Sequence, residues 1–466
     1  MIRLFRHYIP RALLILALTE VAILLCAIFL GRSLRYLTAP YSMSQHPLQD
    51  LPLSAFVFML VMMLILIGMG LYERNFWEGK ADMILRVGVS FLLGLFVMTL
   101  MYYIFPDLYL GRVEFGYAFS IAFIGVISAR YIFLSLSDND ALKRRILVLG
   151  TGIAAAQIED VIGGSNVQGF KIIGFVPIGN SKDCVASGRI LQMESSLYAL
   201  TEQYQIDQIV VATDYVAPDF PTEDVLDCKV NGVNVLDLSN FFEQETGKIR
   251  LDALRPGSMI FSDGFQQLVL KRISKRLFDI AASSLLLLLT WPIMLLTVLA
   301  ISLESGFREP ILYRQIRVGK DEQPFEVLKF RSMRVDAEHD GVARWAQQND
   351  SRVTRVGAFI RSSRIDELPQ LLNVLRGNMS FVGPRPERPE FVTELDQSIP
   401  FYSMRHCVKP GITGWAQICY PYGASEEDAK EKLQYDLYYI KNFSLFLDLM
   451  VLLQTAHVIF WGRGAR

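Results

Sequence analysis

Two acidic residues stand side by side in the segment SRIDELPQ, residues 363–370. They are Asp366 and Glu367, and two basic residues, Arg361 and Arg364, lie just before them. A carboxylate can act as a nucleophile or bind a divalent cation, and guanidinium groups can stabilise the oxygens of a phosphate. Side chains at neighbouring helical positions point about 100° apart, so two adjacent acids can serve two separate roles. The pair therefore indicates chemistry on an anionic substrate.

The same segment also has the features of an ordinary helix start. Asp366 fits the N-cap, Pro369 is tolerated near a helix N-terminus, and Gly377 would end the helix. The two interpretations are compatible, because the free N–H groups and the dipole at a helix N-terminus favour a negatively charged phosphate. We therefore expect the acidic pair to lie where a helix begins.

The composition indicates that membrane segments help to position this pair. Of the 466 residues, 52% are hydrophobic and the mean hydropathy is positive, which is too apolar for an ordinary soluble protein. The net charge of -1 supplies no overall field that would attract nucleic acid. No C-x-x-C pair occurs, which argues against a zinc site and against a disulfide framework. The cysteines are Cys26, Cys184, Cys228, Cys407 and Cys419.

The first third of the chain holds four hydrophobic windows, each close to the roughly 20 residues that cross a bilayer. They cover residues 12–30, 53–72, 87–105 and 115–134. Basic residues cluster before the first window, between the second and third, and after the fourth: Arg3, Arg6 and Arg11, then Arg74, Lys80 and Arg86, then Lys143, Arg144 and Arg145. Because basic loops remain in the cytoplasm, residues 1–136 are predicted to form a four-helix transmembrane bundle with both ends in the cytoplasm.

Two charged residues fall inside these windows, Glu20 in the first and Arg130 in the fourth. A charge in the hydrocarbon layer is costly and often functional. Arg130 is close to the cytoplasmic end of its window, however, and a long arginine side chain can extend to the interface. We therefore expect Arg130 to reach the cytoplasmic surface.

Residues 141–262 have the pattern of a Rossmann-like, parallel α/β domain. The run RRILVLGTGIAAAQIEDVI joins a buried strand to a helix, with Gly150, Gly152 and Ala155 in the spacing of a dinucleotide-binding turn. Three more strand segments follow, FKIIGFV, IDQIVVAT and VNVLDL. However, no acidic residue lies near Val176 to bind a ribose, and no tyrosine has the lysine four positions later that sugar-nucleotide dehydratases use. We expect a regulatory or dimer-forming module, with a membrane-tethered NAD-dependent dehydratase as the alternative.

A fifth hydrophobic run, residues 280–303, is long enough to span a bilayer, yet basic residues flank it on both sides. Four precede it and four follow it: Lys271, Arg272, Lys275 and Arg276, then Arg308, Arg314, Arg317 and Lys320. Because both flanks carry the cytoplasmic signature, we expect a re-entrant helix over 277–303, broken at Pro292. A fifth spanning helix is the alternative. The apolar segment 444–461, interrupted by Asp448, is expected to lie at the membrane interface.

Several ordered segments around and after this run resemble one family of enzymes. They are KRLFDIAAS (275–283), YRQIRVGKDEQPFEVLKFRSM (313–333), RVTRVGAFIRSSRIDELPQLLNVLRGNMSFVGPRPE (352–387), RHCVKPGITGWAQ (405–417) and YDLYYIKNFSLFLDLMVLLQT (435–455). Together they resemble the bacterial sugar transferase family, the large monotopic polyprenyl-phosphate phosphoglycosyltransferases. The resemblance covers residues 271–466 and implies a membrane-associated, mostly α-helical catalytic domain. With its front end, the chain is similar to the long members that start exopolysaccharide, capsule or O-antigen synthesis.

The resemblance implies a transfer of hexose 1-phosphate from a UDP-sugar, UDP-glucose or UDP-galactose, to undecaprenyl phosphate, with release of UMP. It implies that Asp366 is the nucleophile that forms a covalent phosphosugar, and that Glu367 binds Mg²⁺. The partners would be the two substrates and the lipid bilayer, with the catalytic domain facing the cytoplasm from the inner membrane. A catalytically inactive scaffold for polysaccharide assembly is a further alternative.

Four basic residues are candidates for contacts with the substrate phosphates by their match to the family motifs. They are Lys329, Arg331, Arg364 and Arg385. Cleavage of a pyrophosphate spreads negative charge over the phosphoryl oxygens, so positively charged side chains are needed there. For each of the four, a surface salt bridge is the alternative interpretation. The sequence thus predicts a membrane protein of α plus α/β class, with one site built around Asp366.

Overall fold

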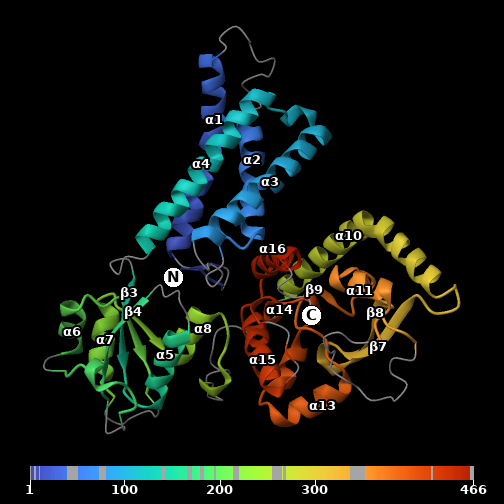
Figure 1. Ribbon diagram of the computed structural model, residues 1–466. Coiled ribbons are helices and arrows are strands. Elements are labelled where there is room, and N and C mark those ends of the chain that lie inside the picture. The colour runs from blue at the N-terminus through green and yellow to red at the C-terminus, as the bar shows by residue number, and fades with distance from the viewer. Residues whose placement is uncertain are drawn as a thin grey trace. The chain divides into compact units, whose positions relative to one another are not determined.

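The computed structural model describes residues 2–4, 7–9, 11–38, 51–72, 80–137, 143–164, 170–178, 183–193, 196–213, 220–253, 265, 269–335, 352–420, 423 and 425–461. The chain forms two compact units, one made mainly of residues 8–245 and the other mainly of residues 246–466. Figure 1 shows the helices and strands of both units. A small two-stranded sheet of β1 (Ile2–Leu4) and β2 (His7–Ile9) lies near the N-terminus.

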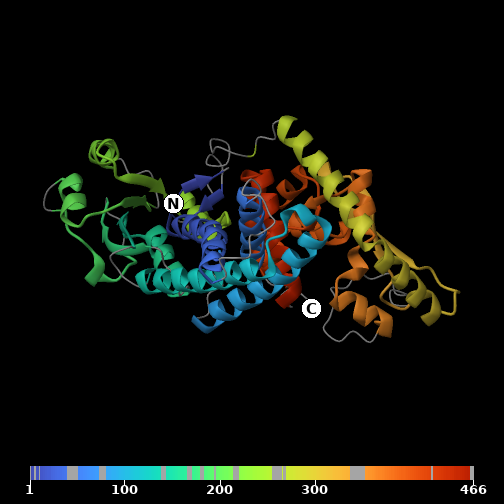
Figure 2. The same cartoon turned by 90° about the horizontal axis from the view of Figure 1, so that it is seen from above.

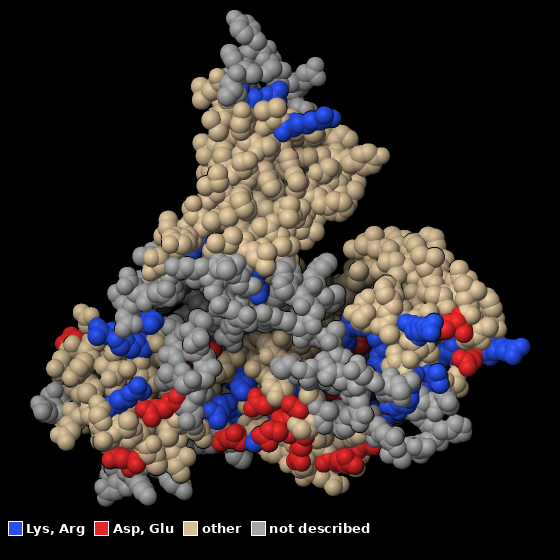
Figure 3. Space-filling model, viewed as in Figure 1, with Lys and Arg blue, Asp and Glu red and all other residues tan. Residues whose placement is uncertain are grey.

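The first unit contains an apolar helix for each predicted membrane window. These helices are α1 (Arg11–Thr38), α2 (Leu51–Gly68), α3 (Lys80–Ile104) and α4 (Arg112–Ser137), with a short 3₁₀ turn η2 (Pro106–Leu108) before α4. Among the described residues, four helices are long and apolar enough to cross a membrane: α1, α3, α4 and the later α10. Helix α2 is equally apolar but shorter, with 18 residues. In Figure 3 these helices form an almost uncharged surface, as membrane helices require.

Small residues bring α1 and α4 very close together. A Cβ atom on Gly31 would lie 2.6 Å from the main-chain nitrogen of Ala118, and one on Gly125 would lie 2.6 Å from a methyl group of Ile23. Close backbone approach at small residues is the usual way in which membrane helices pack. The pair α1 and α4 is therefore tightly joined along its length.

The expectation that Arg130 extends to the membrane surface is wrong. Arg130 and Glu20 are both fully buried between α4 and α1, with Arg130 Nε 2.7 Å from Glu20 Oε1 and Nη2 2.9 Å from Oε2. Arg130 Nη1 also donates to the carbonyl oxygen of Leu71 at 2.9 Å, and the Tyr72 hydroxyl donates to Glu20. Because the carboxylate on α1 faces the guanidinium on α4, a bidentate ion pair inside the bundle replaces exposure to water.

The predicted parallel sheet of the middle domain is confirmed. It contains β3 (Arg144–Leu149), β4 (Phe170–Val176), β5 (Gln208–Val211) and β6 (Asn234–Asp237), all parallel, in the spatial order β4-β3-β5-β6. The accompanying helices are α5 (Ile153–Gly164), α6 (Leu197–Gln203), α7 (Thr222–Val230) and α8 (Leu238–Thr246), with a 3₁₀ turn η4 (Ser187–Arg189). Strand β3 is buried from Ile146 to Leu149, as expected for a central strand covered on both faces.

The glycine-rich turn after β3 is required by the fold of the chain itself. Gly150 has a φ of +123°, and a Cβ atom there would lie 2.3 Å from the carbonyl oxygen of Ala212 at the end of β5. The neighbouring Thr151 carbonyl oxygen accepts a hydrogen bond from the Cys184 N–H at 2.7 Å. The close approach that needs a glycine is thus an approach of the protein's own backbone.

The second unit is built mainly of helices around two small sheets. Its elements up to the acidic pair are η5 (Leu251–Ala253), α10 (Val269–Glu304), β7 (Leu312–Val318), η6 (Lys320–Glu322), β8 (Pro324–Phe330), α11 (Arg355–Ser362) and η7 (Ile365–Glu367). The remaining elements are α12 (Gln370–Arg376), β9 (Ser380–Val382), α13 (Pro389–Ser398), η8 (Tyr402–Cys407), β10 (Gly411–Thr413), α14 (Trp415–Cys419), α15 (Glu426–Lys441) and α16 (Leu445–Trp461). Strands β7 and β8 pair antiparallel, and β9 and β10 pair parallel.

A large apolar core lies among α15, α16, β9 and η8. Its buried members include Val382, Tyr402, Trp415, Leu437 and Tyr438. The segment just after α8 joins this core, since Ile249 and Leu251 are buried in it and Trp415 Nε1 donates to the Gly247 carbonyl oxygen at 2.8 Å. The chain from Thr246 onward therefore packs with the second unit.

Candidate active site

Asp366 and Glu367 lie in the 3₁₀ turn η7 and not at the N-cap of a helix, so that expectation is wrong. Helix α12 begins only at Gln370 after Pro369, and at seven residues it is too short to supply a strong dipole. Its predicted end is confirmed, because Gly377 follows α12 with a φ of 91°. Adjacent residues of a 3₁₀ turn point roughly 120° apart, so the two carboxylates still face different directions.

Helix α12, which follows η7, is held against strand β8 by one asparagine side chain. Asn373 Oδ1 accepts a hydrogen bond from the Leu328 N–H at 3.0 Å, and its Nδ2 donates to the Glu326 carbonyl oxygen at 2.6 Å. The Asn373 amide thus bonds two main-chain groups of β8, as a neighbouring strand would. Lys329 is the next residue of that strand, so the contact brings its side chain beside the acidic pair.

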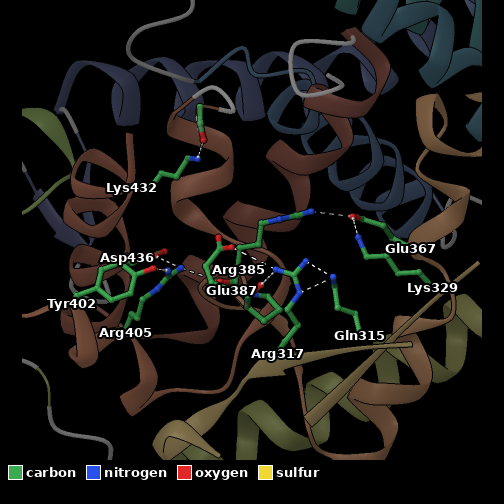
Figure 4. Close-up of polar contacts among 12 residues, drawn as sticks. Gln315, Arg317, Lys329, Glu367, Arg385, Glu387, Tyr402, Arg405, Lys432 and Asp436 are labelled. Atoms are coloured by element: carbon green, nitrogen blue, oxygen red, sulfur yellow. Dashed lines mark hydrogen bonds and ion pairs between the residues drawn. The ribbon is translucent and has the colours of Figure 1, made fainter. Parts of the chain in front are cut away.

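Three of the four predicted cationic residues meet at one oxygen of Glu367. Lys329 Nζ lies 3.0 Å from Glu367 Oε1, and Arg385 Nη2 lies 3.3 Å from the same atom. Arg364 Nη1 is 3.7 Å away and comes from the residue just before η7, which has a left-handed φ of 57°. Figure 4 shows Lys329 and the extended Arg385 side chain approaching Glu367 from different parts of the fold. Left-handed backbone at a residue with a side chain is strained and is frequent at functional sites.

The two carboxyl groups respond differently to this environment. Burial raises the pKa of Asp366 above its usual value and the Glu367 carboxylate adds to this rise, while Lys329, Arg364 and Arg361 oppose it. Burial would also raise the pKa of Glu367, but Lys329, Arg385 and Arg364 outweigh it and hold that pKa well below its usual range. Glu367 is therefore firmly ionised, whereas Asp366 is the more basic carboxylate of the pair.

Arg331, the fourth predicted cation, has a different partner. Its Nη1 lies 2.5 Å from Oε2 of Glu309, and its main-chain N–H donates to the Ile311 carbonyl oxygen at 2.9 Å. Only 9% of Arg331 is exposed. The residue thus ties the end of β8 to the chain that follows α10, and it forms no ion pair with Glu367 among the described contacts.

The first part of α10 is anchored beside the site by polar contacts. Arg276 donates to the carbonyl oxygens of Val374 and Leu375 at the end of α12, each at 2.6 Å. Asp279 Oδ1 accepts from the Ser380 hydroxyl and the Phe381 N–H, both at 3.0 Å. This part of the apolar helix is therefore fixed to α12 and β9, on one side of η7.

The end of α10 contacts the other side of η7. Glu304 Oε1 accepts the N–H groups of Arg355 and Val356 at 2.9 and 3.2 Å, which caps the N-terminus of α11. Ile301 packs in a small core with Phe330 and Ile360.

The long helix α10 contains a proline, Pro292, in its interior. Figure 1 shows that α10 bends near its middle, and in Figure 2 its two halves run nearly in line when seen from above.

A buried polar network joins α10 to the last helices of the unit. Lys275 Nζ lies 2.8 Å from Asp448 Oδ2 and 3.0 Å from the Val382 carbonyl oxygen. The Tyr439 hydroxyl donates to Asp448 Oδ1 at 2.7 Å and to the same carbonyl oxygen at 3.0 Å. Asp448, in the apolar C-terminal segment, therefore faces the protein and orients Lys275 and Tyr439, which both bind the carbonyl oxygen at the end of β9, from which the turn to Arg385 begins.

Residues that the sequence analysis did not assign to the site hold this turn from two other directions. Arg405 Nη2 donates to the Arg385 carbonyl oxygen at 2.9 Å, and Arg317 Nη1 donates to the Pro386 carbonyl oxygen at 3.1 Å. Arg405 also pairs with Asp436 of α15, with Nη2 3.0 Å from Oδ2. All three charged residues occur in the segments that carry the family resemblance, so their position in those segments was the available signal.

The arrangement places a buried, more basic carboxylate next to an ionised carboxylate surrounded by positive charge. Such a site can attack a phosphorus atom with Asp366 while cations accept the charge that develops on phosphoryl oxygens. Among the described residues, no cluster of three or more His, Cys, Asp and Glu side chains could hold a metal ion unaided. A single carboxylate such as that of Glu367 can be enough for Mg²⁺, which usually completes its shell with water and substrate phosphates.

Comparison with known proteins gives one family and several relatives. The bacterial sugar transferase family matches residues 270–462. The chain is 44% identical over 242 residues to a UDP-N-acetylgalactosamine-undecaprenyl-phosphate N-acetylgalactosaminephosphotransferase of Aeromonas hydrophila, covering 51% of this chain and 55% of that protein. It is 33% identical over 366 residues to an undecaprenyl-phosphate glucose phosphotransferase of Komagataeibacter xylinus, covering 74% of this chain and 64% of that protein.

A third relative is matched over almost its whole length. It is an exopolysaccharide production protein of Rhizobium leguminosarum bv. phaseoli, 41% identical over 189 residues, covering 39% of this chain and 93% of that protein. The matches to the first two relatives, by contrast, span less than two thirds of their length. The segment that holds Asp366, Glu367 and their three cationic neighbours lies inside the matched family region.

Proposed function

Because this chain belongs to the bacterial sugar transferase family, we propose that it transfers hexose 1-phosphate from a UDP-sugar to undecaprenyl phosphate. The observation that carries the proposal is the meeting of Lys329, Arg364 and Arg385 at Glu367, directly beside the buried Asp366. Positive charge gathered around one carboxylate supports binding of a pyrophosphate. The adjacent carboxylate supports a covalent route.

In the first step, a carboxylate oxygen of Asp366 attacks the β-phosphorus of the UDP-sugar. The bond from this phosphorus to the oxygen that bridges the two phosphates breaks, and UMP leaves with that oxygen and the bonding electron pair. The phosphosugar stays on Asp366 as an acyl phosphate. The leaving UMP is a dianion, and negative charge also develops on the oxygens of the transferred phosphoryl group. The positions around Glu367 allow three cations to stabilise this charge, namely Arg385, Arg364 and Lys329.

In the second step, a phosphate oxygen of undecaprenyl phosphate attacks the same phosphorus. The bond between phosphorus and the Asp366 oxygen breaks, which restores the carboxylate and produces an undecaprenyl diphosphate sugar. No proton has to be removed from the acceptor, because its phosphate is already anionic at neutral pH. The raised pKa of Asp366 suits this role, since a more basic carboxylate is the better nucleophile.

The residues present fit a magnesium ion. The closest contacts of Lys329, Arg364 and Arg385 all go to Oε1 of Glu367, so we assign Oε2 to the metal. Hard oxygen ligands of this kind are what Mg²⁺ prefers. When bound, the ion would neutralise charge on the pyrophosphate. The low pKa of Glu367 keeps it ionised and ready for that role over the whole physiological range.

We place the catalytic unit on the cytoplasmic face of the inner membrane, with α10 entering the bilayer and returning. A straight helix of 36 residues would be about 54 Å long and would carry one flank across. Instead, Arg276 in the first part of α10 contacts the end of α12, and Glu304 at the last position of α10 contacts the start of α11, so both parts of α10 contact helices that flank η7 in the chain. The bend in α10 and Pro292 within it support the same topology.

The donor sugar is proposed from family likeness alone. UDP-glucose and UDP-galactose are our first choices, and the relatives include enzymes named for glucose and for N-acetylgalactosamine. A panel should therefore contain UDP-glucose, UDP-galactose and UDP-N-acetylgalactosamine. The UMP released from each in the presence of undecaprenyl phosphate identifies the donor.

The decisive experiment compares the wild type with Asp366→Asn. The amide has the same shape as the carboxylate, so we expect a folded protein with UMP release reduced to background. Mass spectrometry of the wild type with donor alone should find one phosphosugar on the peptide that contains Asp366. Asp227→Asn, at an exposed position of α7, is the matched control and should keep normal activity. Near-normal turnover by Asp366→Asn would rule out the covalent mechanism.

A further inference from the structure

Two arginines hold the turn that carries Arg385 through its main chain. Arg405 Nη2 donates to the carbonyl oxygen of Arg385 at 2.9 Å, and Arg317 Nη1 donates to the carbonyl oxygen of Pro386 at 3.1 Å. Two consecutive carbonyl groups of one turn thus each accept a hydrogen bond from a guanidinium group. Figure 4 shows both side chains approaching the turn, while the Arg385 side chain extends away from it toward Glu367.

Arg405 is fixed at both edges of its planar group. Its Nη1 donates to the Tyr402 hydroxyl at 2.5 Å, and its Nη2 lies 3.0 Å from Oδ2 of Asp436. Arg405 is 7% exposed, Tyr402 1% and Asp436 2%. A buried charge is tolerated only with good partners, so this guanidinium has one orientation available to it.

Arg317 is fixed in a similar way from strand β7. Its Nε and Nη2 donate to Gln315 Oε1 at 3.0 and 2.6 Å, and its Nη1 lies 3.5 Å from Oε2 of Glu387. The Val318 N–H donates to the Glu387 carbonyl oxygen at 3.0 Å. Strand β7 therefore binds the turn through the main-chain N–H of Val318 and through the side chain of Arg317.

The start of the turn is held by close packing against β10. The Gly411 N–H donates to the Pro384 carbonyl oxygen at 2.9 Å, and a Cβ atom on Gly383 would lie 2.4 Å from the Lys409 carbonyl oxygen. Every carbonyl group from Pro384 to Glu387 consequently has a donor from outside the turn. An apolar contact would stabilise a surface turn at lower cost than two charged groups, so this arrangement points to a need for accurate placement.

We propose that Arg405 and Arg317 are positioning residues of the transfer reaction, which fix the turn 384–387 so that the Arg385 guanidinium meets the donor pyrophosphate. The proposal rests on the proposed function, because it takes the pyrophosphate as the ligand of Arg385. Neither arginine touches the substrate. Each acts through the main chain of the turn, and a shift of about 1 Å at a charged group can cost up to about a hundredfold in rate.

The test uses lysine substitutions alone and combined with loss of Arg385. Lysine keeps the charge but cannot reproduce the planar fork that reaches several acceptors at once. We expect Arg405→Lys and Arg317→Lys each to lower kcat/KM for the UDP-sugar by about ten- to a hundredfold. In an Arg385→Gln background the same changes should cost less than about threefold, because the group that they position is already absent. If Arg405→Lys and Arg317→Lys lower kcat/KM by the same factor with and without Arg385, the proposal is overturned.

Controls separate positioning from general damage. Arg314→Lys lies on the same strand as Arg317, pairs with Glu326 and is exposed, so it should leave the kinetics unchanged. Melting temperatures of all variants should stay close to that of the wild type. If Arg405→Lys does not fold, Tyr402→Phe replaces it in the test. This change removes only the hydroxyl that accepts a hydrogen bond from Arg405 Nη1, so it should lower kcat/KM by a smaller factor that also depends on the presence of Arg385. A loss that is independent of Arg385 would count against the proposal.

The outcomes for the two proposals differ. A wild type that releases no UMP from any UDP-sugar overturns the proposed function and the positioning role with it. An active wild type whose Arg405 and Arg385 changes combine without coupling overturns only the positioning role. Coupled losses in an active enzyme support both.

Discussion

The ammonium nitrogen of Lys329 lies 3.0 Å from Oε1 of Glu367, although the two residues are 38 positions apart in the chain. One comes from the end of an antiparallel hairpin and the other from a 3₁₀ turn, and Asn373 of α12, the helix that follows this turn, binds the hairpin strand. Together with Arg385 and Arg364, Lys329 holds the pKa of Glu367 far below its usual range against the effect of burial. The pair sets the charge of the site before any substrate binds.

Replacing Glu367 with Gln should reduce activity mainly through the metal. A neutral amide is a poor ligand for Mg²⁺, so we expect turnover to fall by roughly a hundredfold and the Mg²⁺ concentration for half-maximal rate to rise. Titrating Mg²⁺ in the UMP-release assay measures both. Glu326→Gln on the exposed side of β8 is the matched control. An unchanged Mg²⁺ requirement in Glu367→Gln would assign the metal to another acid.

The pH dependence should report the ionisation of Asp366. Burial and the Glu367 carboxylate raise the pKa of Asp366, and only the ionised form attacks phosphorus, so activity should fall on the acid side with an apparent pKa above 3.8. Lys329 lowers this pKa, and Lys329→Met should therefore move the acid limb to higher pH. Rates of UMP release measured from about pH 5 to about pH 8 in the wild type and in Lys329→Met test this shift of the acid limb. An acid limb that moves to lower pH would contradict the assignment.

The re-entrant topology of α10 predicts that both of its flanks face the cytoplasm. Single cysteines at Arg272 and Arg308, placed in a variant without the five natural cysteines, should be protected from a membrane-impermeant thiol reagent in intact cells. Both should react in inverted vesicles, and activity must be retained. Pro292→Leu should straighten some molecules, expose the later site outside and lower activity. Labelling at residue 308 from outside in the protein with Pro292 intact would disprove the re-entrant topology.

The ion pair inside the membrane bundle predicts an uneven response to substitution. Arg130→Met leaves the fully buried Glu20 without its positively charged partner and should destabilise the bundle by about 3–5 kcal/mol. Adding Glu20→Leu should recover most of this loss, because two apolar side chains then replace the pair. Unfolding in a detergent series measures the difference, with Ile132→Met on the exposed side of α4 as the control. Equal stability of the single and double variants would show that the pair has no coupled role.

The elements of this protein could be predicted because their signals are local. Long apolar runs identify membrane helices, and short apolar runs joined by a glycine turn identify the parallel sheet, since each depends on neighbours within a few residues. The adjacent acids Asp366 and Glu367 and the surrounding motifs were sufficient to indicate the family. Gly377 ended α12 as expected, because only a left-handed residue closes the helix there.

The partners of each charged side chain were decided only by the tertiary structure. Lys329 and Arg331 are two positions apart, but Arg331 follows the last residue of β8 and turns to Glu309, while Lys329 is still in the strand and reaches Glu367. Arg130 and Glu20 are 110 positions apart, and their meeting depends on how α1 and α4 are rotated against each other. The energy of an ion pair depends on the distance between the two charges in space and not on their separation along the chain. The sequence therefore specifies which charges exist, and the packing of helices and strands specifies which of them form pairs.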